Sequence, residues 1–345
     1  MRAVQIHAHG GIEQLRYEIT ADPQMTSDQD VIVKLRAASV NSNDISTRSG
    51  LTGVKLGFPH IIGSDGAGTV VATGMRVRNV KVGDAVSLYP ACGCAVCEFC
   101  VTDREYLCPG LRLMGERESG TYAEYVRVHA RNCFLIPPGL SFEEAAALPL
   151  VFVTVWRMLM TNAELKPGES VLIRGVSGGF ATAALQISAS LGSHVIVSDD
   201  SGDQLATARK LGAKHAIDEH EIDLSKEVRR LTGKRGVDVV VDCVGGDGWV
   251  KSLAALAKGG RLVTCGASAG VNPQTDVRRI FWNDLTIFGS TLGTREEFRQ
   301  VLNFLNVTRT KPVIDQVYSL KDAAQAQHRM TEENHLGKII LRMDA

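Results

Sequence analysis

Hydrophobic and polar residues follow two different patterns along the chain, and the change falls near Leu150. Before that point, short β-branched segments bounded by glycine and proline predict strands over 31–36, 69–73 and 122–128. Glycine stands at most of the junctions between these segments. This pattern favours a β-rich lobe of irregular topology for the first third of the chain.

Beyond Leu150, continuous apolar segments alternate with segments of helical periodicity. Buried parallel strands are typically apolar throughout, and strands separated by helices form right-handed βαβ units. The middle of the chain is therefore predicted to be a doubly wound α/β domain. Its strands are expected over 170–174, 194–198, 237–242, 261–265 and 285–289, with helices ending at Leu191 and spanning 204–211. A helix over 296–305 and a last strand over 338–341 follow.

The first of these strands leads directly into a glycine-rich turn that opens a helix. A dinucleotide-binding turn needs glycines so that the backbone can approach a pyrophosphate, and a small residue, here Ala181, so that the helix packs on the strand. The helix N-terminus then offers unpaired N–H groups to the anion. The residues expected to hold the cofactor here are Gly175, Ser177, Gly178, Gly179 and Phe180.

An acidic residue, Asp199, stands about 20 positions further on, at the end of the second strand. A carboxylate there accepts hydrogen bonds from ribose hydroxyls and repels a 2′-phosphate, and no basic residue follows until Arg209. We therefore expect NAD(H) to be preferred over NADP(H). The competing interpretation is an ordinary strand-to-helix turn followed by an exposed pair of aspartates.

Composition excludes several classes of protein. Lys+Arg and Asp+Glu both number 38 in the 345 residues, so the formal net charge is zero, and no basic segment predicts nucleic-acid binding. No apolar stretch approaches the roughly 20 residues that span a bilayer, and the first residues lack the apolar core of a signal peptide. A cytoplasmic protein without membrane or nucleic-acid partners is the expectation.

Cysteine is the unusual component, because five of the eight cysteines fall between Cys92 and Cys108. Four of them have spacings of two, two and seven residues, which allow four thiolates to surround one Zn²⁺. Such a site has no open coordination position, so the zinc would be structural. The predicted ligands are Cys94, Cys97, Cys100 and Cys108. Cys92 is either a substitute ligand or a bystander, while Cys133, Cys243 and Cys265 are isolated in sequence, the last two predicted as buried apolar thiols.

Together these motifs resemble the medium-chain dehydrogenase/reductase superfamily, which includes zinc alcohol dehydrogenases and quinone oxidoreductases. The resemblance covers essentially the whole chain. It implies an α/β protein with a split GroES-like β-barrel catalytic domain and a Rossmann domain of doubly wound parallel sheet. The expected boundaries are 1–152 with 288–345 for the catalytic domain, including a zinc lobe near 92–108, and 153–287 for the Rossmann domain.

The sequence departs from the zinc-dependent members at the catalytic metal. Where those members carry Cys, His and Cys, this chain has Asn41, Ser64 and Leu150. Leu cannot ligate a metal, and neutral Asn and Ser oxygens are poor zinc ligands. We therefore expect no catalytic zinc, as in the quinone oxidoreductase branch. Asp65 is expected to act as a structural partner of a base such as Lys338.

The resemblance also implies the remaining site residues. Those expected to line the pocket beside the nicotinamide are Asn41, Asn43, Asp44, Ser46, Ser64 and Thr154, with Asn43 and Ser46 as candidates for a proton relay or carbonyl donor. Each has the alternative role of a polar turn residue. Further cofactor contacts are expected from Val244, Gly266, Ala267, Phe288, Gly289 and Ser290.

Without a Lewis acid, an enone or quinone is the easiest hydride acceptor, because its product anion is delocalised. The expected activity is hydride transfer from NAD(P)H to such a small molecule. Two alternatives stay open: an alcohol or aldehyde dehydrogenase that uses side-chain acids and bases, and a nucleotide-binding protein with little turnover. A homodimer or homotetramer is expected by analogy.

Overall fold

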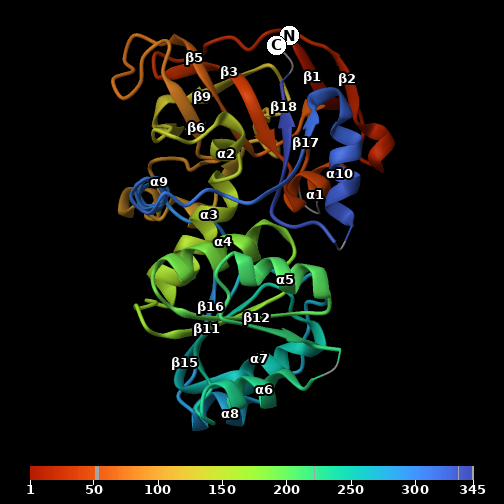
Figure 1. Cartoon of the computed structure of the whole chain (residues 1–345). Helices are drawn as coiled ribbons and strands as arrows, with labels where there is room; N and C mark the ends of the chain where they lie inside the picture. The colour runs from red at the N-terminus through yellow and green to blue at the C-terminus, as the bar shows by residue number, and fades with distance from the viewer. Residues whose placement is uncertain (51–53, 221, 333, 344–345) are drawn as a thin grey trace. The chain divides into compact units, whose positions relative to one another are not determined.

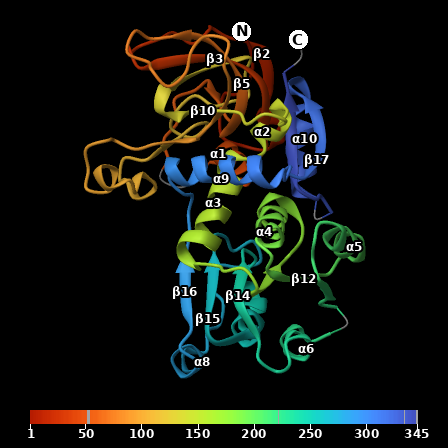
Figure 2. The ribbon, with the colours of Figure 1, turned by 60° about the vertical axis from the view of Figure 1, so that its left-hand side comes forward.

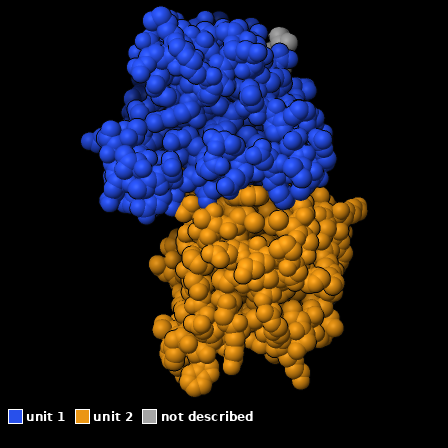
Figure 3. Space-filling view, turned by 90° about the vertical axis from the view of Figure 1, so that its left-hand side faces the viewer, with its two compact units in different colours: residues 1–153, 294–345 blue, residues 154–293 orange. Residues whose placement is uncertain are grey.

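The computed structural model describes residues 1–50, 54–220, 222–332 and 334–343 (Figure 1). The chain divides into two compact units, which Figure 3 colours separately. Unit 1 comprises Met1–Val153 and Thr294–Ala345, and unit 2 comprises Thr154–Gly293. The first unit is therefore assembled from both ends of the chain, with the second inserted between them.

A parallel sheet with the strand order β13-β12-β11-β14-β15-β16 forms the centre of unit 2 (Figure 2). The order runs outward in both directions from β11, as the doubly wound prediction requires. The central strand β14 is buried along almost its whole length, which explains its apolar sequence. The strands are β11 (Ser170–Arg174), β12 (His194–Asp199), β13 (His215–Asp218), β14 (Val237–Asp242), β15 (Leu256–Thr264) and β16 (Thr286–Gly289).

Helices cover both faces of this sheet: α4 and α5 lie on one face, and α6, α7 and α8 on the other (Figure 1). They are α4 (Gly178–Ser190), α5 (Gly202–Lys210), α6 (Leu224–Leu231), α7 (Trp249–Ala255) and α8 (Val277–Trp282). A core of aliphatic residues on the α6–α8 side includes Leu172, Val240 and Leu262, each fully buried. Burying each such side chain contributes about 1.5–3 kcal/mol to folding.

Unit 1 is built on a mostly antiparallel sheet with the order β10-β6-β5-β3-β18-β17, and β9 also pairs with β3. Strand β18, from the C-terminal segment, pairs antiparallel with β3 and parallel with β17. The strands are β3 (Asp30–Ser39), β5 (Asp65–Thr73), β6 (Ala85–Leu88), β9 (Tyr125–His129), β10 (Cys133–Leu135), β17 (Ile314–Ser319) and β18 (Lys338–Arg342). This pairing brings residues near 40, 65 and 338 to neighbouring strands.

Smaller elements complete unit 1. A second sheet has the order β2-β1-β4, and β7 pairs with β8 in the cysteine-rich lobe. These strands are β1 (Arg2–Ile6), β2 (Arg16–Ile19), β4 (His60–Ile61), β7 (Ala91–Cys92) and β8 (Arg112–Leu113). The helices are α1 (Ser42–Ser49), α2 (Phe142–Ala146), α3 (Pro149–Trp156), α9 (Arg295–Thr308) and α10 (Ala323–Thr331). Along the chain, helix α3 contains the boundary between unit 1 and unit 2, which falls between Val153 and Thr154. It continues as a π-helical turn over Arg157–Asn162.

The structure differs from the expectations in two strand bounds and one domain boundary. The predicted strand over 122–128 begins as β9 only at Tyr125, because Tyr122 instead exchanges backbone hydrogen bonds with Ile62 and Val4. The strand predicted over 261–265 starts earlier, at Leu256, and ends at Thr264. Residues 288–289 lie in β16 of the parallel sheet and within unit 2, not in the catalytic domain expected for them.

None of the helices in the described residues combines the length and the apolar character needed to cross a bilayer.

Candidate functional site

The glycine-rich turn of unit 2 has the backbone that an anion site requires. Gly175 and Gly178 have φ angles of +73° and +78°, in the left-handed region that glycine adopts without strain. Ser177 is the N-cap of the 13-residue helix α4, and its side chain makes no capping hydrogen bond. The first N–H groups of a helix have no intrahelical partner and lie at the positive end of its dipole. A cofactor phosphate therefore fits this turn.

Asp199 lies at the end of β12, next to the turn. Its Oδ2 accepts a hydrogen bond from the N–H of Val176 at 2.6 Å, and its Oδ1 accepts from Asp200 and Ser201 at 2.9 and 3.0 Å. Desolvation raises the pKa of this carboxyl. Besides the ribose contact expected of it, Asp199 therefore holds the glycine-rich turn through the N–H of Val176, a role that the sequence did not predict. An ionised carboxylate has about four acceptor positions, so one remains for a ribose hydroxyl.

The other predicted cofactor residues lie at the carboxyl ends of β14, β15 and β16. The loops after β14 and β15 are in contact: the N–H of Ala269 donates to the carbonyl of Val244 at 2.8 Å, and Gly245 forms a bridge with Gly270. After β16, the Oγ of Ser290 is buried without a hydrogen-bond partner in the described structure. An orphaned hydroxyl at this edge fits the carboxamide contact predicted for Phe288–Ser290.

A buried ion network that the sequence analysis missed stabilises this edge. Arg174, the last residue of β11, contacts Asp242 at 3.1 Å and Glu219 at 3.4 Å. Asp242 also accepts hydrogen bonds from the N–H groups of Val244 and Gly245, at 3.0 and 2.9 Å. The only sequence signal was the presence of charged residues where otherwise apolar strands end.

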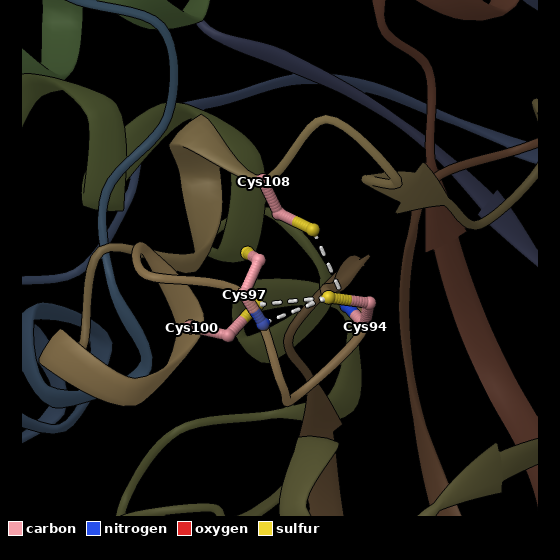
Figure 4. Close-up of side chains that lie close together, drawn as sticks. All are labelled: Cys94, Cys97, Cys100 and Cys108. Atoms are coloured by element: carbon pink, nitrogen blue, oxygen red, sulfur yellow. Dashed lines mark hydrogen bonds between the residues drawn. The ribbon is translucent and has the colours of Figure 1, made fainter.

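The cysteine-rich lobe of unit 1 brings its four predicted ligands together (Figure 4). The sulfur atoms of Cys94, Cys97, Cys100 and Cys108 all lie within 4.8 Å of one another. Four sulfurs about 2.3 Å from a tetrahedral zinc would be separated by roughly 3.8 Å, so the cluster fits a structural zinc ion. Cys92 is not in the cluster; it lies in β7 and pairs with Arg112 of β8.

Two local features adapt the lobe to this cluster. A Cβ on Gly93 would lie 2.5 Å from the Sγ of Cys100, so this position has room only for glycine. The backbone N–H groups of Val96 and Cys97 lower the pKa of Cys94 to about 6. Cys94 is therefore already a thiolate at neutral pH, which is the form that binds metals.

Unit 1 contains a second candidate site, a buried polar cluster at the start of α1. The ammonium of Lys338 contacts Asp65 Oδ2 at 3.5 Å and donates to Asn41 Oδ1 and to the carbonyl of Val40. Asp65 Oδ2 also accepts from Asn41 Nδ2 at 2.8 Å and from the Ser39 hydroxyl at 3.0 Å. Lys338 is 3% exposed and Asp65 is fully buried. Burial lowers the pKa of Lys338, and the Asp65 carboxylate opposes this.

The three positions where zinc-dependent relatives are expected to carry metal ligands meet at this cluster. Asn41 and the N–H of Leu150 bind the two oxygens of Asp65, the latter at 2.9 Å, and Ser64 precedes Asp65 in the chain. None of the three supplies a thiolate or an imidazole. Within the described residues, the four cysteines are the only group of three or more His, Cys, Asp or Glu side chains with ligand atoms close enough to share a metal ion.

A chain of hydrogen bonds adjoins this cluster. Asn43 Nδ2 donates to Ser64 Oγ at 2.6 Å, and Ser64 Oγ donates to Asp44 Oδ1 at 3.1 Å. Asp44 Oδ2 accepts from the backbone N–H of Asn41 at 2.9 Å and from the hydroxyl of Tyr122 at 3.2 Å. Burial raises the pKa of Asp44 to about 7, and the neighbouring Asp65 adds to this effect. Asp44 is thus a carboxyl group that can hold or release a proton near neutral pH.

Other predicted residues differ in their placement. Asn43 is half-buried, and its Oδ1 has no hydrogen-bond partner in the described structure. Ser46 is exposed on α1 and is not connected to Asp44 or Ser64 by a described hydrogen bond. Thr154 is buried in α3. Tyr122 was missed, because its sequence signal was only that of a strand residue.

Comparison with known proteins identifies the class that this fold and these sites define. The model of the alcohol dehydrogenase GroES-like domain matches residues 27–138, and that of the zinc-binding dehydrogenase matches residues 179–306. A zinc-type alcohol dehydrogenase-like protein of Schizosaccharomyces pombe is 31% identical over 97% of this chain and 96% of that protein. The quinone oxidoreductase of Homo sapiens is 28% identical over 99% and 97%. The crystal structure of an NAD-dependent alcohol dehydrogenase is 38% identical, with a TM-score of 0.95 and 100% of both chains covered.

The chain therefore belongs to the medium-chain dehydrogenase/reductase superfamily, and it is an oxidoreductase of that type. The predicted fold class, a split GroES-like domain with a Rossmann parallel sheet, is confirmed.

Proposed function

We propose that this enzyme transfers hydride from NADH to the activated C=C bond of an enone, or to a quinone, without a catalytic zinc ion. One observation carries the proposal. Where zinc-dependent relatives are expected to hold the catalytic metal, this chain places the Asn41–Asp65–Lys338 cluster. Its donor groups are already committed to one another, and the three ligand positions offer no sulfur or imidazole nitrogen.

The chemistry follows from what the remaining groups can stabilise. A bound reduced nicotinamide supplies a hydride, and the acceptor becomes an enolate or phenolate whose charge is spread over several atoms. Hydrogen-bond donors are sufficient to stabilise such a delocalised anion. A simple ketone would give a localised alkoxide, for which a metal ion or a strong acid is needed.

The Asp44–Ser64–Asn43 chain supplies the proton-handling groups. At neutral pH, Asp44 is about half protonated, since its pKa is raised to about 7. A protonated Asp44 donates to Ser64 Oγ, which reverses the hydrogen bond and lets the Ser64 hydroxyl donate onward. A pKa close to the working pH is the condition under which a general acid is most effective. We assign the proton donor to this chain, with Asn43 orienting Ser64.

Cofactor binding is assigned to the edge of unit 2 described above. The phosphates lie on the turn at Gly175, Ser177, Gly178, Gly179 and Phe180; the nicotinamide end is held by Val244, Gly266, Ala267, Phe288, Gly289 and Ser290. Asp199 selects NADH, because its carboxylate repels a 2′-phosphate. Asp199→Ser should shift the ratio of NADPH to NADH kcat/KM by about 10-fold or more toward NADPH. Asp203→Ser, an exposed aspartate four residues on, should leave the ratio unchanged, and an unchanged ratio in Asp199→Ser would contradict the assignment.

An alcohol dehydrogenase is the second candidate, favoured by the 38% identity to the NAD-dependent alcohol dehydrogenase structure. Cyclohexenone and cyclohexanone separate the two functions, because they differ only in the C=C bond. We expect NADH oxidation with cyclohexenone and benzoquinone, little with cyclohexanone, and no NAD⁺ reduction with cyclohexanol. Turnover of cyclohexanone and cyclohexanol equal to that of cyclohexenone would favour the alcohol dehydrogenase.

Removing the proposed proton donor provides a second test. Asp44→Asn should lower kcat with cyclohexenone by about 10²–10⁴-fold, the usual contribution of a general acid. The quinone reaction should fall less, since its hydroquinone anion is a weaker base. Equal, small losses for both substrates would contradict the role of Asp44.

A homodimer or homotetramer stays a prediction from the family resemblance.

A further inference from the structure

Two thiols that are 22 residues apart in sequence lie side by side at the cofactor edge of unit 2. Cys243 follows β14 and Cys265 follows β15, and their sulfur atoms are 3.2 Å apart. The expectation of two isolated apolar thiols is therefore wrong, because the two sulfur atoms are in contact. The reason is the register of two neighbouring parallel strands: Val241 pairs with Val263, so the residues two positions further on face each other on the same side of the sheet.

The geometry is suitable for a covalent bond. Neighbouring strands lie about 4.8 Å apart, which falls within the Cα–Cα range of about 4.4–6.8 Å that a disulfide spans. The sulfurs need to approach from 3.2 Å to about 2.05 Å, a movement that side-chain rotation can supply. Both residues are partly exposed at the edge of the sheet.

The two thiols are also electronically unequal. The hydrogen bond between the two sulfur atoms lowers the pKa of Cys243 and raises the pKa of Cys265. Cys243 is thus the better thiolate, and Cys265 is the thiol placed to react second. Cys133, by comparison, is buried in β10, and burial raises the pKa of its thiol to about 12.

We propose that Cys243 and Cys265 form a reversible disulfide when the enzyme meets a hydroperoxide. The Cys243 thiolate attacks the hydroperoxide, the O–O bond breaks, and an alcohol or water leaves, so that Cys243 becomes a sulfenic acid. Cys265 then attacks the Cys243 sulfur, the S–S bond forms, and the S–O bond breaks with loss of water. Two thiols lose two electrons in total, and the hydroperoxide gains them. A dithiol reverses the reaction.

This disulfide would act on cofactor binding. The predicted cofactor residue Val244 follows Cys243, and the predicted residues Gly266 and Ala267 follow Cys265. The two loops are already close: a Cβ on Gly266 would lie 3.1 Å from the Cys243 carbonyl oxygen. Joining the sulfurs draws both loops together, which weakens NADH binding, and bound NADH in turn opposes oxidation. This second part rests on the proposed function, whereas disulfide formation does not.

The test begins with the intact wild-type protein treated with hydrogen peroxide, followed by alkylation of free thiols and peptide mass analysis. A cross-linked peptide pair containing Cys243 and Cys265, lost on treatment with dithiothreitol, is expected. In Cys265→Ser, the cross-link should be replaced by a sulfenic acid at Cys243 that dimedone traps. Cys133→Ser is the matched control and should cross-link like wild type.

Functional coupling is measured separately, by NADH fluorescence titration of the reduced and the oxidised protein. We expect binding to weaken between about 5- and 150-fold on oxidation and to recover with dithiothreitol. Absence of the Cys243–Cys265 peptide at peroxide levels that form other cysteine oxidation products would overturn the disulfide. Cross-linking with unchanged NADH affinity would overturn the coupling. Failure of the reduced protein to bind NADH, with the cross-link still formed, would count against the proposed function and leave the disulfide intact.

Discussion

The cysteine lobe and the Asn41–Asp65–Lys338 cluster both lie in unit 1, and they balance the charge of closely packed polar groups in opposite ways. Each gathers polar groups at one point. In the lobe the groups are four cysteine sulfurs, which bind a metal cation as thiolates. In the buried cluster, the protein supplies its own cation, the ammonium of Lys338. The comparison shows that donor chemistry and internal charge balance, not polarity alone, distinguish a metal site from a structural network.

The largest loss of stability is expected from removing the ammonium group of Lys338. Lys338→Met leaves Asp65 buried without its ion pair, which typically costs about 3–5 kcal/mol of unfolding free energy. Urea denaturation measures this loss. Lys321→Met, at an exposed lysine, should change stability by less than about 0.5 kcal/mol.

A double variant sharpens this result. Asp65→Asn together with Lys338→Met should be more stable than the sum of the two single losses predicts, because neither partner then remains as an unpaired charge. Strict additivity would mean that the two groups do not compensate each other.

The next largest effect is the change in stability with pH that the titration of Asp44 causes. The pKa of Asp44 is raised from 3.8 to about 7 in the folded protein. Between these values the unfolded chain has released the proton while the folded chain retains it. The stability from this group is therefore fully present below about pH 4, decreases as pH rises toward 7, and is constant above that.

The comparison with Asp44→Asn isolates this contribution, because asparagine does not titrate. The stability difference between wild type and variant should fall by at most about 1.4 kcal/mol per pH unit between pH 5 and pH 7. Urea unfolding at several pH values measures it. A difference that stays flat over this range would show that Asp44 is ionised in the folded protein.

A smaller effect, on zinc affinity, is expected from a substitution in the cysteine-rich lobe. Gly93→Ala places a Cβ 2.5 Å from the Cys100 sulfur, which must then move. Zinc affinity should fall by about 10-fold or more, measured by competition with a chelator, while kcat stays within about 2-fold because this zinc does no chemistry. Gly57→Ala, with open space at its Cβ and no positive φ, tests the backbone effect alone, since Gly57 and Gly93 both lie outside helices. A parallel loss of kcat with zinc would show that the lobe takes part in catalysis.

The smallest effect concerns two serines of the predicted pocket. Ser64→Ala interrupts the hydrogen-bond chain from Asp44, whereas Ser46→Ala changes only an exposed hydroxyl. We expect a kcat decrease with cyclohexenone of about 10-fold or more for the first and less than about 2-fold for the second. The reverse order would move the relay to Ser46, as the sequence analysis had also allowed.

Sequence patterns with short-range causes were predictable. The apolar strands, the glycine turn and the cysteine spacing each follow from residues near one another in the chain, and the four thiols indeed come together. Asn41, Ser64 and Leu150 could be placed only through the family resemblance. The pairing of β3 with β5 brings Asn41 and Ser64 together, and Leu150 joins them from α3 through its N–H on Asp65.

What escaped prediction depends on hydrogen bonds and register that no local pattern records. Asp199 holds the glycine-rich turn through the N–H of Val176, and Tyr122 reaches Asp44 from 78 residues away. Cys243 and Cys265 looked isolated because the sequences of β14 and β15 do not predict the register between these strands. That register brings the two cysteines together.

The zinc content of the purified wild-type protein tests the central claim most directly, namely that metal holds the lobe while hydride transfer proceeds without it. Elemental analysis should give one zinc per chain in wild type, and none in Cys100→Ser. Two zincs per chain, or one zinc that persists in Cys100→Ser and is lost with activity in Asp65→Asn, would contradict the account.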